Sequence, residues 1–172
     1  MSSVNECVNA GVAYFPEQNS VAGYVLFENI NEGCIVRAFF SKLPAGEHGF
    51  HIHKAGDLRG EGCKGACDHY HKGTPSAHGG PPPCVERHTG DLGNISKAPF
   101  YKSYVLNNVS VEELYGRSVI VHADPDDLGK GPFEDSITTG HSGKRIACAI
   151  IGRTTGGTGC VMTKKQTRKA KK

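Results

Sequence analysis

Two histidines in the segment Gly49-Phe50-His51-Ile52-His53 have the spacing of metal ligands on a β-strand. In an extended chain successive side chains point to opposite faces, so His51 and His53 project the same way, about 7 Å apart, and Phe50 and Ile52 project the other way. Two imidazoles around one point suit a metal ion. The alternative is a pair of histidines that faces solvent, and this short motif alone does not exclude it.

Five more potential ligands follow along the chain. His69, His78, His88 and Asp91 lie in a glycine- and proline-rich stretch that can fold back on itself, and His122 follows an apolar, strand-like run. Neutral imidazoles and a carboxylate suit Zn²⁺ and Cu²⁺. Seven potential ligands exceed the set that one four-coordinate ion uses. Either two metal sites exist or several histidines are spectators, and the residue types leave both interpretations open.

The elements that must position these ligands are predicted to be short β-strands. The 172 residues include 23 glycines, nine prolines, no tryptophan and 37% hydrophobic residues, which favours short strands joined by turns over long helices. Turn-forming segments separate the alternating apolar runs, as antiparallel hairpins require. We therefore predict an all-β fold, with strands at 12–15, 21–27, 35–40, 49–53, 104–106, 118–121 and 146–151.

The segment from Ala55 to Gly93 shows no secondary-structure pattern. Loops beyond about 12–15 residues in compact domains are usually functional or disordered, so we expect metal ligands and a disulfide to order this one. A second polar loop is predicted from Ala123 to Lys144. A Gly/Thr-rich linker and a basic tail come last, so we expect one domain over residues 1–152 and a disordered segment over residues 153–172.

Charge is distributed unevenly along the chain. The formal net charge is +3, but the last twelve residues contain six basic residues and no acid. Over residues 1–160 fourteen basic residues therefore face seventeen acids, so this part carries −3 and the tail carries +6. The tail could contact nucleic acid or an acidic surface, but a solvated terminus is the better prediction.

The N-terminus lacks the positive patch and apolar run of a secretory signal, and no stretch approaches eighteen apolar residues. We therefore expect a cytoplasmic protein without membrane contact. If the gene is viral, which the sequence does not show, the expected compartment is the host cytoplasm.

Several ordered segments closely resemble the copper,zinc superoxide dismutases. The resemblance spans roughly residues 4–152, and the block Arg87-His88-Thr89-Gly90-Asp91-Leu92-Gly93-Asn94 is its most specific part. The other segments are Gly49-Phe50-His51-Ile52-His53, Gly62-Cys63, His78-Gly79-Gly80-Pro81, Val121-His122, Asp126-Asp127-Leu128-Gly129-Lys130-Gly131 and Arg145-Ile146-Ala147-Cys148.

The resemblance implies that one histidine, His69, bridges two metals as an imidazolate. Asp126 matches the family's outer carboxylate, which joins one copper histidine to one zinc histidine, here His51 and His78. Two sets of ligands follow, copper with His51, His53, His69 and His122, and zinc with His69, His78, His88 and Asp91.

The resemblance also implies the activity. One copper per chain would take an electron from one superoxide to release O₂ and give it to a second to form H₂O₂, while one zinc per chain would be structural. His69 would deliver a proton, and Arg145 would attract the anionic substrate. Glu134 and Asp135 match charges that shape the field along the approach path.

The charges around the predicted channel differ from those of common family members. Asp124 and Thr138 stand where lysines are usual, whereas His141 and Lys144 are additions that partly compensate. We therefore expect a lower, or differently salt-dependent, rate of substrate capture.

The family resemblance implies an eight-stranded Greek-key barrel, flattened like an immunoglobulin-type sandwich, with the metals outside the barrel under two long loops. It implies a disulfide between Cys63 and Cys148 that closes a loop of about 85 residues. It also implies a homodimer whose contact surface matches segments 56–62, 115–116 and 150–151.

Other residues depart from the family pattern. Cys67 and Cys84 lie in the first long loop, where we do not expect cysteine, so a second disulfide or adventitious metal binding stays open. Cys160 is expected to be an exposed thiol. His71, two positions after His69, is a second choice as a zinc ligand.

Two other functions fit the same fold, a copper-delivery protein and a zinc-stabilised structural protein. All four copper positions are filled and the tail contains no Cys-x-Cys pair. The enzyme is therefore the favoured prediction.

Overall fold

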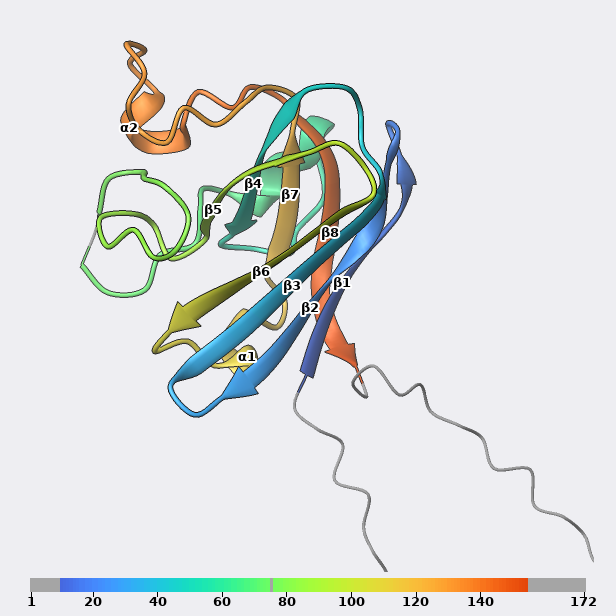
Figure 1. Cartoon of the computed structure of the whole chain (residues 1–172), viewed down its shortest axis with the longest axis vertical. Helices are drawn as coiled ribbons and strands as arrows, with labels where there is room; N and C mark the ends of the chain where they lie inside the picture. The colour runs from blue at the N-terminus through green and yellow to red at the C-terminus, as the bar shows by residue number, and fades with distance from the viewer. Residues whose placement is uncertain (1–9, 75, 155–172) are drawn as a thin grey trace, which may run out of the picture.

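Eight β-strands form the body of the protein, and the computed structural model describes residues 10–74 and 76–154 (Figure 1). Seven strands overlap runs predicted from the sequence. The eighth, β5, begins inside the segment predicted to be a loop and ends after it. The strands are β1 (Ala10–Gln18), β2 (Val21–Ile30), β3 (Gly33–Lys42), β4 (Glu47–His53), β5 (Asp91–Ser96), β6 (Phe100–Asn107), β7 (Ser118–His122) and β8 (Arg145–Thr154).

The strands form one sheet that curls into a nearly closed barrel. Their order is β5-β4-β7-β8-β1-β2-β3-β6, and every pairing is antiparallel. The connections from β3 to β4 and from β6 to β7 join strands that are not neighbours, whereas hairpins join β1 to β2 and β2 to β3. The predicted all-β Greek-key barrel is confirmed.

Alternation along the strands places one face of each inside the barrel. Phe15, Phe40 and Phe50 are fully buried there. The ring centroid of Phe40 lies 5.4 Å from that of Phe15 and 5.7 Å from that of Phe50. Aromatic rings at these separations bury large apolar areas and interlock, so strands from both halves of the sheet are held together.

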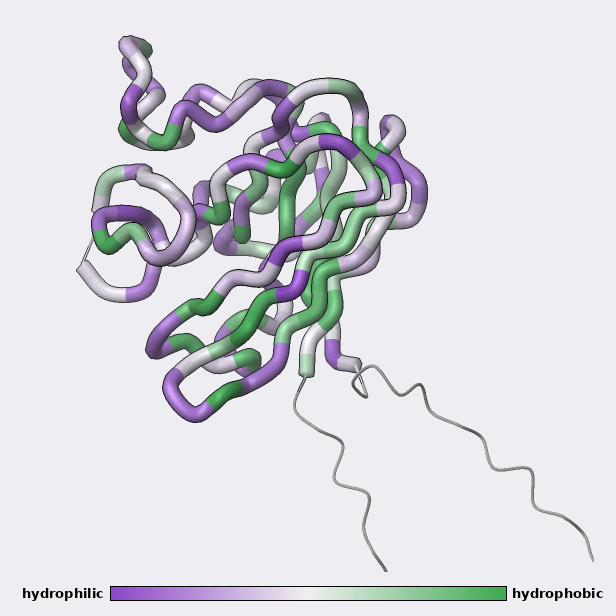
Figure 2. The backbone as a smooth tube through the Cα atoms, in the orientation of Figure 1, coloured by the Kyte–Doolittle hydropathy of each residue, from purple (hydrophilic) through white to green (hydrophobic). Residues whose placement is uncertain are grey.

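Two long loops project from the same side of the barrel, on the left in Figure 1. The first runs from residue 54 to residue 90 and contains a 3₁₀ helix, η1 (Glu61–Ala66). The second runs from residue 123 to residue 144 and contains α2 (Ser136–Thr139), while α1 (Val111–Leu114) lies between β6 and β7. Figure 2 shows that hydrophobic residues concentrate on the strands and that the loops are mostly hydrophilic. The His78 N–H donates to the Ile137 carbonyl at 2.8 Å and so ties the two loops together.

The first loop is shorter than predicted, because Asp91, Leu92 and Gly93 belong to β5. At the other end of the domain, β8 continues two residues beyond Gly152. The basic tail and Cys160 lie outside the described residues. Among the residues that are described, no helix is long and apolar enough to cross a membrane.

Truncation of a core aromatic ring should destabilise the barrel. Phe40→Ala is expected to lower the free energy of unfolding by about 3–5 kcal/mol, because it leaves a cavity among buried rings. Urea unfolding of the metal-free protein measures the change. Phe39→Ala is the control, because Phe39 is partly exposed and its ring contacts Tyr24 on the outer face. Equal losses in both variants would contradict the assignment of Phe40 to the core.

Candidate metal centre

Strand β4 turns alternate residues to opposite sides. Phe50 and Ile52 are buried in the barrel core, and His51 and His53 lie on the other side of the strand, also buried. The ring centroids of His51 and His53 are 6.4 Å apart. Strand β7 pairs with β4 and ends at His122, whose ring lies 4.8 Å from that of His51. Two rigid strands therefore fix three imidazoles.

The first long loop returns to β4 and adds the other histidines. His69 forms an isolated antiparallel bridge with His53. Its ring stacks on that of His51, with centroids 4.0 Å apart and 29° between the ring planes. The rings of His78 and His88 lie 5.1 and 5.6 Å from the ring of His69. The first long loop is thus anchored on the strand that carries the first two imidazoles.

Two groups of potential ligand atoms share one member, His69, and a third, smaller group joins His51 and His78 to Asp126. In each group the ligand atoms lie within 4.8 Å of one another. All seven side chains singled out from the sequence are included, and the division equals the one that the resemblance implied. The first group is His51, His53, His69 and His122, and the second is His69, His78, His88 and Asp91.

Each of the six histidines has one ring nitrogen that is buried and lacks a hydrogen-bond partner within the described residues. In several rings the other nitrogen is held in place. The Nδ1 of His53 lies 2.8 Å from the Cys67 carbonyl oxygen. The Nδ1 of His122 lies 3.2 Å from the Gly143 carbonyl oxygen. Buried polar atoms normally have partners, so unpaired nitrogens that converge fit metal ions. They are His51 Nδ1, His53 Nε2, His69 Nε2, His78 Nδ1, His88 Nδ1 and His122 Nε2.

Asp91, the first residue of β5, brings a buried carboxylate to the second group. Its Oδ1 lies 2.8 Å from Nδ1 of His69, and its Oδ2 accepts the backbone N–H groups of Gly79 at 3.1 Å and His88 at 2.8 Å. Burial acts to raise the pKa of Asp91, but the contacts from the histidines outweigh burial and hold that pKa well below its ordinary value. The second group therefore contains a fixed negative charge.

Asp126 connects the two groups, because it contacts one histidine of each. Its two carboxylate oxygens contact Nε2 of His51 at 2.9 Å and Nε2 of His78 at 2.7 Å. Asn94 exchanges two hydrogen bonds with the backbone of Asp126, at 2.7 and 2.8 Å. Gly140 has a φ of +65°, and a Cβ there would lie 2.1 Å from Oδ1 of Asp126. Asn94 and Gly140 were missed as site residues, although Asn94 ends the most specific block of the resemblance.

The two groups differ in charge. Burial lowers the pKa values of His51 and His53 well below the ordinary value and lowers the pKa of His122 to about 3. These rings are neutral, which is the form that binds metal. Burial also acts to lower the pKa of His78, but the nearby carboxylates of Asp126 and Asp91 outweigh burial and raise that pKa to about 9. Carboxylates thus surround the second group, and imidazoles alone form the first.

A family described as copper/zinc superoxide dismutase (SODC) matches residues 21–151. The chain belongs to this family. The Cu-Zn superoxide dismutase of Paramecium bursaria Chlorella virus 1 is 48% identical to it over 144 residues, which cover 78% of this chain and 74% of the relative. The crystal structure of the clock protein EA4 is similar, with a TM-score of 0.74 and 32% identity over 90% of this chain and 100% of that chain. The two metals in the name of the superoxide dismutase family correspond to the two ligand groups.

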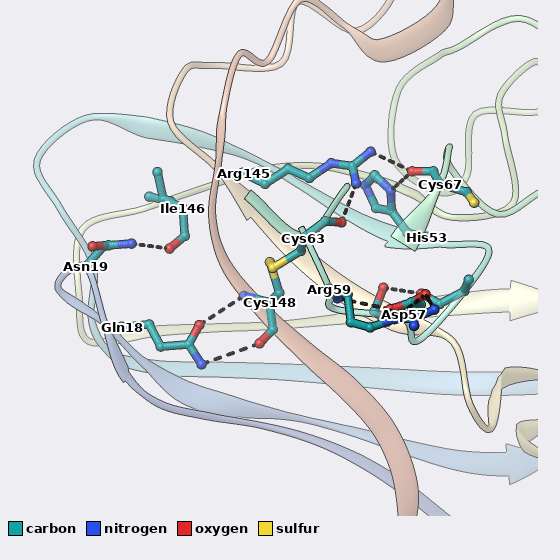
Figure 3. The surroundings of a disulfide bond; sticks show 12 residues. Gln18, Asn19, His53, Asp57, Arg59, Cys63, Cys67, Arg145, Ile146 and Cys148 are labelled. Atoms are coloured by element: carbon teal, nitrogen blue, oxygen red, sulfur yellow. Dashed lines mark hydrogen bonds and ion pairs between the residues drawn. A yellow bond between two sulfur atoms is a disulfide. The ribbon is translucent and has the colours of Figure 1, made fainter. Parts of the chain in front are cut away.

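Arg145 begins β8 beside the imidazole group of this superoxide dismutase domain. Its guanidinium donates to the carbonyl oxygens of Cys63 at 2.7 Å and of Cys67 at 2.5 Å (Figure 3). The Cys67 carbonyl also contacts His53, so one backbone oxygen positions both an imidazole and the arginine. The expected disulfide between Cys63 and Cys148 is present and fixes the first of these two anchors.

The departures from the superoxide dismutase pattern lie outside both ligand groups. His71 is hydrogen-bonded through Nε2 to the Thr74 carbonyl and through Nδ1 to the Thr89 N–H, so it braces the loop and is not among the clustered ligands. Cys67 and Cys84 are both free and exposed. The structure therefore contains no second disulfide between them.

Loss of the Asp126 clamp should weaken metal binding. Asp126→Asn retains the shape but replaces one acceptor oxygen by a donor, so His51 and His78 can no longer both be held. Outer partners of metal-bound histidines typically contribute about 10–100-fold in metal affinity. Competition with a zinc chelator measures the change. Asp124→Asn is the control, because Asp124 is exposed and belongs to neither group; an equal loss in both variants would argue against the clamp.

The metal-free protein should lose stability as the pH falls. His122 has a pKa of about 3 in the folded chain against an ordinary 6.5, so below pH 6.5 the unfolded chain binds a proton that the folded chain does not. The free energy of unfolding is expected to decrease from pH 6.5 down to pH 3. Urea unfolding at several pH values measures this slope. His122→Asn should show a shallower slope, and an unchanged slope would contradict the assignment.

Proposed function

We propose that the protein is a superoxide dismutase that binds one copper and one zinc per chain. The observation that carries the proposal is the presence of two ligand groups that share His69, in a chain that belongs to the superoxide dismutase family. In this proposal copper is bound by His51, His53, His69 and His122, and zinc by His69, His78, His88 and Asp91.

The residues suit these metals in number and type. The copper group offers four imidazoles with unpaired nitrogens. The zinc group offers three imidazoles and an ionised carboxylate, a tetrahedral set typical of Zn²⁺. Copper supplies a reversible one-electron exchange, by which one superoxide gives up an electron as O₂ and a second gains it, with two protons, as H₂O₂.

In this proposal His69 transfers a proton and Arg145 attracts the substrate. The Nδ1 of His69 faces Asp91, and its buried Nε2 has no hydrogen-bond partner among the described residues. In the proposed reaction this Nε2 takes up a proton and donates it to the reduced substrate. Arg145 attracts the anion, and its guanidinium is anchored by carbonyl oxygens and forms no ion pair within the described part of the chain. Its charge is therefore available to the substrate.

The second loop modifies the approach of the anion. The Nδ1 of His141 lies 2.7 Å from a carboxylate oxygen of Asp135, and the His141 ring stacks on Phe133 with centroids 3.7 Å apart. His141 is thus occupied with a neighbouring acid, which leaves Lys144 as the added cation next to Arg145. We infer that substrate capture depends on salt differently from family members with lysines at positions 124 and 138.

We also infer that the protein is a two-fold homodimer. The segments 56–62, 115–116 and 150–151 lie side by side, because the Gly116 N–H donates to the Ile151 carbonyl at 3.0 Å and a Cβ on Gly56 would lie 2.4 Å from the Gly116 oxygen. Ile150 is 48% exposed and offers an apolar contact to a second copy. A contiguous surface patch with an exposed apolar residue suits an isologous dimer.

Metal analysis combined with a superoxide-consumption assay tests the proposed activity. The expected result is about one copper and one zinc per chain, with activity lost in His51→Ala and His122→Ala. His71→Ala should retain most of the activity, because His71 belongs to neither ligand group. Zinc alone, with no activity after copper loading, would overturn the proposal.

Removal of the charge of Arg145 should slow substrate capture. Arg145→Ala is expected to lower the second-order rate constant about tenfold, because one unit charge at close range is lost, and to flatten its dependence on ionic strength. Pulse radiolysis at several salt concentrations measures both quantities. Lys130→Ala removes an exposed charge elsewhere in the second loop and should change little. If both variants behave alike, Arg145 has no special role in capture.

A charge within the proposed dimer contact should separate the subunits. Ile150→Glu is expected to raise the dissociation constant of the dimer at least tenfold, because it buries an unpaired carboxylate. Sedimentation equilibrium measures the change. Val85→Glu is the control, since Val85 is 91% exposed on the first loop. A wild-type protein that sediments as a monomer would disprove the dimer.

A further inference from the structure

Four aromatic residues form a line across the outer face of four neighbouring strands. Strands β1, β2, β3 and β6 lie side by side in one layer of the barrel (Figure 1). In their registers Tyr14 pairs with Tyr24, Tyr24 with Phe39, and Phe39 with Tyr101. Residues that are paired across strands point to the same face of the sheet. We call these four residues the aromatic row.

The aromatic row is open to solvent. Tyr14 and Tyr101, at its two ends, are 66% and 67% exposed. Tyr24 is exposed as well and Phe39 partly so, and the centroids of these two rings are 5.3 Å apart. Neighbouring strands are about 4.8 Å apart, so the row extends over about 14 Å. Contiguous exposed apolar surface of this kind marks binding sites in soluble proteins.

The aromatic row and the metal centre lie on opposite faces of the barrel. Phe40 of β3 and Phe50 of β4 both point into the core, and their ring centroids are 5.7 Å apart. Phe39 and His51, the next-door residues on these strands, therefore point outward on the two sides. No residue of the row belongs to either ligand group or to the segments of the proposed dimer contact. A partner bound to the row would leave the metal centre open.

The charges beside the aromatic row cancel. On one side Arg37 forms an ion pair with Glu28, and on the other the Nζ of Lys42 lies 2.6 Å from a carboxylate oxygen of Glu17. Lys102 directs its Nζ over a buried ring on the inner side of β6, 5.0 Å from the ring centre. A nucleic acid requires cations that are free to contact its phosphates. The row is therefore complementary to an uncharged partner.

Hydroxyl groups accompany the rings. Three members of the row are phenols, whose O–H group both donates and accepts. The Ser103 hydroxyl donates to the Tyr101 oxygen at 3.5 Å, so the phenol hydrogen of Tyr101 stays available to a ligand. Flat apolar rings with a polar group at one end suit a partner that has flat apolar faces and a polar rim. The sugars of an extended β-1,4-linked chain have this form, with C–H groups on the faces and hydroxyls at the rim.

We propose that the aromatic row binds an uncharged, extended β-1,4-linked glucan. The sugar rings stack by their C–H faces on the aromatic rings, and the phenol groups bond to the hydroxyls at the rim. Rings on alternate strands recur about every 10 Å, which is close to the length of one disaccharide in such a chain. Each contact on an open face is weak, and a polymer supplies several contacts in line. The glucan would hold the protein on a polysaccharide surface with the metal centre turned outward.

Binding of the full-length protein to microcrystalline cellulose tests the proposal. The protein is mixed with cellulose at low and at high salt, and the unbound fraction is measured after centrifugation. High salt screens any contribution of the basic tail. Soluble cellohexaose serves as competitor. The binding step does not depend on the proposed dismutase activity, so each can fail without the other.

The wild-type protein is expected to bind equally well at low and high salt and to be released by cellohexaose. Tyr24→Ala/Tyr101→Ala should weaken binding about tenfold or more, because two aromatic anchors are lost. Tyr24→Phe/Tyr101→Phe keeps both rings and should retain most of the affinity. Phe133→Ala is the matched control, because it removes a half-exposed ring on the second loop, outside the row, and should bind as the wild type does.

Thermal unfolding shows whether each variant is folded, and Tyr101→Ala alone, on the edge strand β6, replaces the double variant if that variant unfolds. A wild-type protein that does not bind cellulose at high salt would overturn the proposal, as would equal losses in Phe133→Ala and the double alanine variant. Two further results would assign the row to another partner and overturn the glucan. They are binding to single-stranded DNA, or association of the protein beyond a dimer, that the double alanine variant abolishes.

Discussion

Buried imidazole nitrogens without hydrogen-bond partners are the constraint on which the rest of the structure depends. Six such nitrogens converge in the metal centre, and because buried polar atoms normally have partners, their convergence fits the two metal ions of the proposed function. The chain can hold this arrangement because β4 and β7 are paired strands of a packed barrel, and because Asp91 and Asp126 fix ring orientations from outside. The packed barrel and the two carboxylates therefore hold the ligand cluster in place.

The same constraint explains the irregular loops. A loop that carries three histidines cannot follow a regular hydrogen-bond ladder and also bring its rings against one strand. The chain solves this with local contacts, such as the bridge between His53 and His69 and the backbone bond from His78 to Ile137. The second loop contacts the first through this backbone bond, and Gly140 supplies the space that Asp126 needs.

Part of this arrangement was predictable from the sequence. The positions of His51 and His53 follow from the two-residue period of a strand, and the structure places their rings 6.4 Å apart. The division of seven ligands between two groups did not follow from spacing, because loop residues have no period; the family resemblance supplied it. Strand β5 was missed because Asp91 and Asn94 are polar residues next to glycines, which is a turn pattern, although the strand is buried for most of its length.

Asn94 and Cys67 illustrate a second limit of predicting site residues from the sequence. Asn94 acts on the metal centre through the backbone of Asp126, so its importance depends on a tertiary contact 32 residues away along the chain. Cys67 acts through its carbonyl oxygen, and that atom is present in every residue type. A search for reactive side chains finds the thiol of Cys67 and overlooks the oxygen that positions His53 and Arg145.

The shared Cys67 carbonyl has a consequence for how this protein can vary. Because the oxygen belongs to the main chain, substitution of the side chain leaves it in place, and an alanine scan across the loop would pass over it without effect. Cys67 has a φ of +59°, so what selection must preserve at this position is a backbone shape. Glycine, which adopts that shape with the least strain, would serve equally well.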